Sequence, residues 1–256
     1  KSILGEEENI NEIELNDLHN FHKKYYIPIN SCIAIAGKLP KNYLEIFNNC
    51  EFRESRKNLT DSKQICLDNK TIKKGREIAF FKDIEFSRIF MTWQIPYAKD
   101  QKNILGYEII SSILTDGRNS ILNRSLKEEK QIVESIYSGI QPGEFGSLFI
   151  IEASLERENL KKVEDIINNL LQELLTNSNL SNKIKKALRI VKSNYIFNLE
   201  TSSQLSQFYG NHLLWGRLNP QIELSKNFKY WKSTENLRKL IKFLLQDKFT
   251  FIAYKI

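Results

Sequence analysis

The two ends of the sequence carry the same pattern. In each, three apolar residues stand three and four positions apart, as on one face of a helix, and three more apolar residues follow at a matching distance. The first set is Leu18, Phe21 and Tyr25 with Ile33, Ala34 and Ile35; the second is Leu237, Leu240 and Leu244 with Ile252, Ala253 and Tyr254. The match predicts two similar units, each ending in a helix followed by a strand.

Composition then suggests where one unit stops and the next begins. The stretch from Phe52 to Arg76 is polar and has no hydrophobic period, which is typical of a linker or a long surface crossing. We therefore expect residues 1–60 to be the carboxyl-terminal tail of a first unit, 61–75 a linker, and 76–256 a complete second unit. The chain starts at Lys1 and its only Met is Met91, so we interpret it as a processed or trimmed product.

The pattern between these ends predicts an α+β fold. Helices are predicted over 15–26, 43–47, 103–114, 120–127, 160–175 and 181–199, with further helical segments up to residue 245. Strands are predicted over 31–36, 78–81, 88–95, 133–140, 147–155 and 249–254, and a Gln-Pro-Gly-Glu turn at 141–144 joins two of them. We expect an antiparallel-rich sheet with helices packed on one face.

Three stretches resemble the insulinase family of zinc peptidases, which includes pitrilysin and the mitochondrial processing peptidases. They are Phe21–Asn30 with its following Ile35-Ala36-Gly37, Leu114–Leu122 with its following Leu126–Lys130, and Phe145–Phe149. The first is similar to the helix, Tyr-x-Pro-x-Asn turn and strand that end the family's catalytic half. The other two are similar to a helix–turn–helix and a strand start in its second half. The resemblance extends from about Ile3 to Leu175.

The resemblance implies a protein built from two similar α+β halves that close like a clamshell around a peptide. The family's chemistry needs His-x-x-Glu-His on a helix and a downstream Glu, which together hold Zn²⁺ and activate water. That motif is absent here, where the histidines are only His19, His22 and His212. We therefore expect no catalytic residue, no metal ligand and no cofactor in this chain, and we expect zinc in the intact parent.

Two positions of the second half bear on substrate binding. In some family members, an Arg and a Tyr seven positions later hold the substrate backbone near the zinc; the matching residues are Lys127 and Glu134. A Lys lacks the planar, bidentate fork of Arg, and a Glu would repel a carbonyl oxygen. Zinc-bearing subunits of two-chain relatives commonly lack this pair, so the departure favours a parent of that kind, which would depend on a second family subunit.

The expected role is therefore that of the non-catalytic, carboxyl-terminal part of a zinc metallopeptidase, forming half of a peptide-enclosing chamber and a subunit interface. Its partners would be a peptide substrate, the amino-terminal catalytic half and a second family subunit. The hairpin Val133–Leu155 is the candidate surface to which a substrate strand could add. The alternative is a catalytically inactive structural subunit of the same family.

The remaining features favour plain structural roles. The lysines and arginines at 183, 185, 186, 189 and 192 are spread around one helix without interleaved aromatic residues, so a nucleic-acid surface is not expected despite the net charge of +7. Three cysteines without Cys-x-x-Cys spacing read as reduced thiols, with Cys32 buried in a strand, in a cytoplasmic or similarly reducing compartment. No apolar run is long enough to cross a membrane.

Other possible sites have weaker support than their structural interpretation. His19 and His22 lie on one helical turn but lack a third ligand, and His212 is expected to be packed or to cap a helix. Glu128, Glu129 and Glu144 could suggest paired carboxylates for acid–base chemistry. A charged, exposed helix end is the better interpretation.

Overall fold

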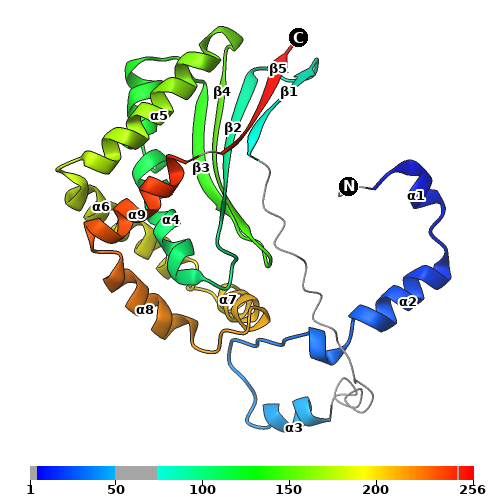
Figure 1. Cartoon of the computed structure of the whole chain (residues 1–256). Helices are drawn as coiled ribbons and strands as arrows, with labels where there is room; N and C mark the ends of the chain where they lie inside the picture. The colour runs from blue at the N-terminus through cyan, green and yellow to red at the C-terminus, as the bar shows by residue number, and fades with distance from the viewer. Residues whose placement is uncertain (1–4, 50–73, 247) are drawn as a thin grey trace. The chain divides into compact units, whose positions relative to one another are not determined.

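The computed structural model describes residues 5–49, 74–246 and 248–256 (Figure 1). The chain divides into two compact units. Unit 1 comprises Lys1–Ile65 and Thr201–Leu214, and unit 2 comprises Cys66–Glu200 and Trp215–Ile256.

The sheet of unit 2 has five strands in the order β1-β5-β2-β4-β3. They are β1 (Gly75–Phe81), β2 (Ser87–Ile95), β3 (Ser135–Gln141), β4 (Ser147–Leu155) and β5 (Phe249–Lys255). Only the β1–β5 pair is parallel, and the other three pairs are antiparallel, which confirms the prediction of an antiparallel-rich sheet. The predicted strand positions are confirmed for all five.

Helices cover one face of this sheet (Figure 1). The α-helices of unit 2 are α4 (Gln101–Thr115), α5 (Leu160–Thr176), α6 (Leu180–Phe197), α8 (Pro220–Tyr230) and α9 (Thr234–Leu244), and a short 3₁₀ turn, η4 (Arg157–Asn159), precedes α5. The α+β prediction, with helices on one face, is confirmed.

The core lies between the sheet and the helices. Alternate residues of β2 and β4 are almost completely buried toward the helices, and Met91 stands opposite Ile151 in the ladder. This period of two is what a strand with one covered face requires. The most central helix is α4, where residues on all sides are buried, so its sequence is apolar around most of its circumference.

A polar cluster fastens α4 to the edge strand β3. The hydroxyls of Thr115 and Ser138 lie 2.8 Å apart, and the Ser138 amide donates to the Thr115 hydroxyl. Ser111, one turn earlier on α4, donates its hydroxyl to the carbonyl of Ser138 at 2.8 Å. Because Thr115 and Ser138 are buried and Ser111 is partly buried, their mutual hydrogen bonds fix the register between helix and strand.

The segment predicted as a helix over 120–127 is helical but has π geometry in its main part. This π-helix, η3 (Asn123–Glu129), ends with the Lys130 amide bonded to the Ser125 carbonyl, five residues earlier. Gln131 then takes a positive φ of 50°, which turns the chain toward β3. A side-chain period alone could not distinguish this wider helix from an α-helix.

Unit 1 contains short helices and few buried side chains. Its elements are α1 (Glu7–Asn11), α2 (Leu15–Tyr25), the 3₁₀ turn η1 (Pro28–Asn30), α3 (Tyr43–Asn48) and α7 (Ser202–Leu214). Apolar residues of α2 that form a predicted helix face stay exposed, and Leu18 and Phe21 are each 56% accessible. Within the described residues of unit 1, only His212 is buried.

The predicted strand over 31–36 is wrong for the described part of the chain. These residues carry no ladder, and Cys32 is only partly buried, with its thiol 3.1 Å from the carbonyl of Gly210. A strand exists only where a neighbouring backbone pairs with it, and no described segment does so here. Of the predicted linker 61–75, only Lys74 and Gly75 lie within the described residues, and Gly75 already belongs to β1.

None of the helices in the described ranges is long and apolar enough to pass through a bilayer.

Candidate functional site

The sheet face opposite the helices of unit 2 is the main candidate surface. No helix of unit 2 covers it in Figure 1, and the side chains that point to it are only partly buried. They include Phe90, Thr92 and Gln94 of β2, Leu148 and Ile150 of β4, and Phe249 and Phe251 of β5. We call these residues the open face. A sheet surface that is both apolar and partly accessible is suited to contact another polypeptide.

Cross-strand pairs organise the open face. Phe90 and Phe251 stand opposite each other in the β2–β5 ladder, with ring centroids 6.1 Å apart. Arg88 and Glu152 form a longer ion pair of 3.6 Å on the same face. Both charged side chains are in contact with water, so this ion pair contributes little to stability. It places a polar group beside the apolar residues of the open face.

The edge strand β3 borders the open face. The pair of β3 with β4 leaves the other side of β3 without a strand partner among the described residues. The side chain of Tyr137 in β3 is 60% exposed. Its ring lies across Gly139, and a Cβ added at Gly139 would stand 2.0 Å from the Tyr137 hydroxyl. The predicted hairpin Val133–Leu155 therefore supplies part of the open face and an edge strand whose central residue, Ser138, is already bonded through its backbone to α4.

The two predicted substrate-binding positions lie close together at the start of β3. Lys127, near the end of η3, donates from its ammonium group to the backbone carbonyl of Glu134 at 2.6 Å. Both side chains are exposed. The ammonium group thus joins the π-helix to the strand, a structural task that uses one of its three donors.

The carboxylates near this corner form ion pairs. Glu128 accepts from Arg118 at 2.6 Å, and Glu129 accepts from Arg124 at 2.7 Å. The Glu128 carboxylate raises the pKa of the Arg118 guanidinium. Glu144 lies exposed in the β3–β4 turn. Glu128 and Glu129 are thus held by arginines, and within the described residues no two of these three carboxylates are bonded to each other, as acid–base chemistry would require.

The histidines do not form a common site. His22 stacks on Tyr26 at 4.8 Å between ring centroids, and Asp17 caps α2 by accepting from the Glu14 amide. His212 is buried and packs edge-on against Phe208 at 4.4 Å, as expected for a packed residue. Among the residues that the structure describes, no three potential ligands come together to hold a metal ion.

A partly buried acid, Glu108 of α4, lies between α4 and α6 and was not predicted from the sequence. The Tyr195 hydroxyl donates to both carboxylate oxygens of Glu108, at 3.0 and 3.2 Å. Burial raises the pKa of Glu108 to about 7, against the opposing influence of this hydrogen bond. Glu108 keeps partial contact with water, because it also borders a pocket of about 360 Å³. The sequence feature that could have indicated this site is the single Glu in the mostly apolar run 104–114.

The basic residues of α6 divide between two sides of the helix. Lys183 and Lys186 border a small pocket beside α4, whereas Lys185, Arg189 and Lys192 border a groove beside α8. The prediction that they spread around the helix is confirmed. No aromatic residue is interleaved with them in 183–192, but Tyr195 further along the chain and Phe228 of α8 line the same groove.

Comparison with known proteins places the chain in a family. A family model described as "Peptidase M16 inactive domain" matches residues 12–188. The chain is 24% identical over 243 residues to the zinc protease PqqE of Helicobacter pylori, covering 92% of this chain and 53% of that protein. It is 22% identical over 224 residues to the uncharacterized zinc protease YmxG of Bacillus subtilis, covering 84% and 51%. The chain thus spans about half the length of these curated relatives.

A solved structure shares the fold. The crystal structure of a protease from Helicobacter pylori superposes with a TM-score of 0.75 at 20% identity, covering 98% of this chain and 61% of that one.

Proposed function

The chain belongs to the peptidase M16 inactive domain family, and from that premise we propose that unit 2 forms one wall of a peptide-enclosing chamber. In this proposal the zinc chemistry resides in a separate catalytic half, because the sequence contains no His-x-x-Glu-His. The wall is the open face, and its task is to hold a peptide rather than to cut it.

The open face carries this proposal. Partly buried aromatic and aliphatic side chains, such as Phe90, Phe251 and Ile150, offer apolar contact to many sequences without demanding one. At the neighbouring edge of β3, the backbone amide and carbonyl of Ser138 are already bonded to Thr115 and Ser111 of α4, so an extended peptide could add as a strand only along the ends of β3. Apolar contact, with limited backbone pairing at the ends of β3, suits a broad peptide binder.

The amino-terminal part of unit 1 belongs, in this proposal, to the catalytic half. Its exposed apolar residues, among them Leu18, Phe21, Ile33 and Ile35, form more apolar surface than such a small unit can cover by itself. We assign residues 1–60, the amino-terminal part of unit 1, to the tail of the catalytic half, with 61–75 as linker and 76–256, which includes α7 of unit 1, as the non-catalytic half. The sheet of that catalytic half would pair with residues 31–36 and cover the apolar side of α2.

Lys127 and Glu134 fit a wall that does not grip the substrate backbone. Lys127 already donates to the Glu134 carbonyl, and the Glu134 carboxylate would repel a substrate carbonyl. A second family subunit would supply the missing gripping pair, so the chamber would form between subunits.

Peptide binding by the whole 256-residue chain tests the proposal. Fluorescent casein peptides are titrated with the wild type, with a Phe90→Ser/Phe251→Ser variant, and with an Ile222→Ser control on α8, whose side chain is 59% exposed. The open-face variant should bind several-fold more weakly, and the control should bind as the wild type does. Absence of binding by the folded wild type would contradict the chamber wall and favour a structural subunit instead.

A further inference from the structure

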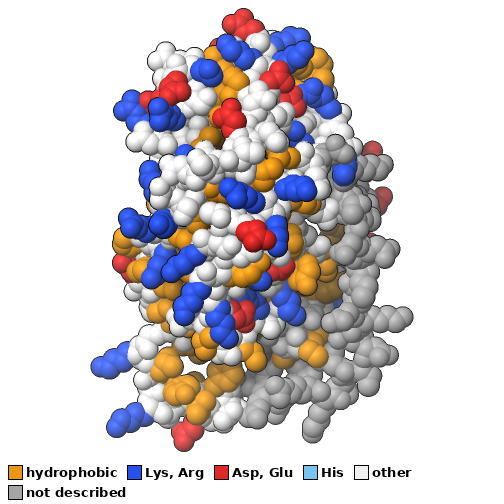
Figure 2. Space-filling view, turned by 60° about the vertical axis from the view of Figure 1, so that its left-hand side comes forward, with side chains coloured by type: hydrophobic (Ala, Val, Ile, Leu, Met, Phe, Trp, Pro, Cys, Tyr) orange, Lys and Arg blue, Asp and Glu red, His pale blue; other side chains and the backbone are white. Residues whose placement is uncertain are grey.

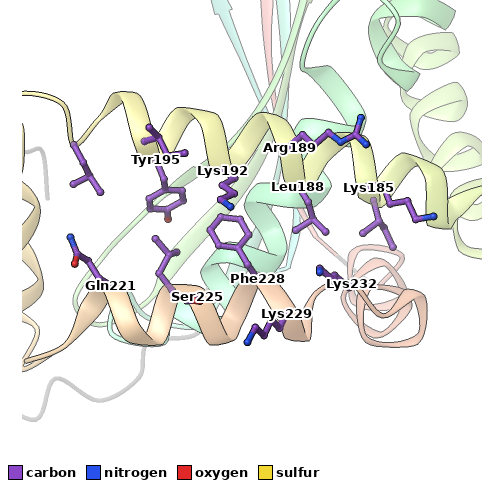
Figure 3. Close-up of a pocket in the computed structure, with 14 residues that line it drawn as sticks. Lys185, Leu188, Arg189, Lys192, Tyr195, Gln221, Ser225, Phe228, Lys229 and Lys232 are labelled. Carbon is purple, nitrogen blue, oxygen red and sulfur yellow. The ribbon is translucent and has the colours of Figure 1, made fainter.

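A groove in the helix layer of unit 2 stands apart from the open face. It runs between α6 and α8 and has a volume of about 630 Å³ (Figure 3). Its lining comes only from α6, the residues just after it, α8 and Lys232. The chamber wall proposed above uses none of these residues.

An apolar seam forms the floor of the groove. Leu188, Tyr195 and Leu199 follow one another at intervals of seven and four, so they lie on one side of the α6 segment. Phe228 approaches from α8, with its ring 6.0 Å from that of Tyr195 and nearly perpendicular to it. Figure 3 shows Leu188 and Tyr195 pointing from α6 toward α8, with Phe228 between the two helices.

The position of Tyr195 is held from beneath the floor. Its hydroxyl donates to Glu108 on α4, so the ring cannot rotate out of the seam without breaking both hydrogen bonds. The groove is therefore set in advance by a contact from the core side.

The rim of the groove is basic. Lys185, Arg189 and Lys192 line it from the α6 side, and Lys229 and Lys232 line it from the other side. No acidic residue lines the groove, and within the described parts of the chain none of these five cations forms an ion pair. Figure 2 shows the surrounding surface, where blue side chains clearly outnumber red ones.

The groove has the dimensions of a short helix. From Ile184 to Leu199 the lining extends over about 22 Å at the rise of an α-helix, or about four turns. An apolar seam flanked by cations on both sides matches an amphipathic helix with an apolar stripe and acidic flanks. We propose that this groove binds an acidic, amphipathic helix of about four turns from a partner protein.

Two other ligands fit less well. An anionic membrane surface is nearly flat on this scale, so it would not reach the floor at Tyr195 and Phe228. A nucleic-acid strand would meet the cations, but the aliphatic part of the floor would remain without a partner.

Charge reversal on α6 offers a matched test. Arg189→Glu/Lys192→Glu reverses two groove cations three residues apart, and Lys183→Glu/Lys186→Glu makes the same change in charge at the same spacing on the other side of the helix. The probe is a labelled 16-residue synthetic helix with Leu at alternating third and fourth positions and Glu at its flanks. Binding to the whole chain is measured by anisotropy, after circular dichroism confirms folding.

We expect the wild type to bind the acidic helix with an affinity that falls as salt rises. The Arg189→Glu/Lys192→Glu variant should bind at least about tenfold more weakly, and the Lys183→Glu/Lys186→Glu control should bind within about twofold of the wild type. Phe228→Ser should also weaken binding, which a purely electrostatic contact would not predict. Equal weakening by both double variants would overturn the proposal. So would binding of anionic vesicles or a single-stranded oligonucleotide in preference to the acidic helix.

Discussion

Two glycines in the middle of helices should respond in opposite directions to the same substitution. Gly106 lies on α4, where an added Cβ would stand 2.5 Å from both Leu240 and the ring of Trp231. Gly210 lies on α7, where the added Cβ would meet only Ala34, at an ordinary 3.6 Å. Alanine favours a helix over glycine by about 1 kcal/mol at either position, so the surroundings decide the sign.

The surroundings of Gly106 are rigid. Trp231 is 2% exposed, and its indole donates to the Lys102 carbonyl at 2.6 Å, so the ring cannot move away cheaply. Overpacking of a dense core costs about 1–3 kcal/mol, and shifting the indole would also weaken its hydrogen bond, worth about 1 kcal/mol. After the helix gain is subtracted, we expect Gly106→Ala to destabilise unit 2 by about 1–3 kcal/mol, and Gly210→Ala to be neutral or stabilising by up to about 1 kcal/mol.

Urea unfolding measures both effects. All three tryptophans (Trp93, Trp215 and Trp231) lie in unit 2, so their fluorescence follows Gly106→Ala, while far-ultraviolet circular dichroism follows Gly210→Ala. A Trp231→Phe background should reduce the loss at Gly106, because the smaller ring leaves room for the methyl group. If Gly106→Ala stabilises the fluorescence transition, the close packing of α4 against Trp231 is refuted.

Three further outcomes are expected. In the folded protein the pKa of Glu108 is about 7, above its ordinary value of 4.5, so the wild type should lose stability as pH rises from about 4.5 through about 7. The loss should be at most about 3 kcal/mol, since water reaches the carboxyl. Glu108→Gln should flatten this pH dependence in urea midpoints measured from about pH 4 to 8, and an unchanged dependence would refute the raised pKa of Glu108. Lys127→Ala should lower the free energy of unfolding by about 0.5–1.5 kcal/mol, because the hydrogen bond to the Glu134 carbonyl is lost. Lys127→Arg should lower it by less in the same urea unfolding assay. Ile151→Ala, in the centre of β4, should cost about 2–5 kcal/mol by thermal unfolding, and a loss below about 1 kcal/mol would contradict its complete burial.

Local periodicity was sufficient to predict most of unit 2. The strand Ser147–Leu155 was predicted to the residue because its alternation reflects one covered face. The helix–strand pattern near the carboxyl end was also correct, since α9 and β5 pack within one unit. The same pattern near the amino end gave only a helix, because the residues at 31–36 have no described strand beside them. A strand depends on its neighbour, and a single segment cannot show whether that neighbour is present.

The candidate sites show the same limit more strongly. Lys127 could be named from a resemblance, but its bond to the Glu134 carbonyl depends on the π geometry of η3, which residue spacing does not reveal. The groove between α6 and α8 combines Arg189 with Phe228, residues far apart in sequence, so a scan of one helix could not detect it. Charges on separate elements become one surface only through packing.

The place of β5 in the sheet has a consequence for how the protein is made. This strand comes after every other element of unit 2 in the chain, yet it lies between β1 and β2 in the sheet. During synthesis, β1 therefore emerges about 170 residues before its only described neighbour, at ribosomal rates a wait of roughly 10–30 seconds. Until then Ile89, Met91 and the aromatic residues of β1 have an uncovered edge beside them. The nascent chain should therefore need chaperones until β5 has been made, and a chain that ended before Phe249 would leave β1 without its described neighbour.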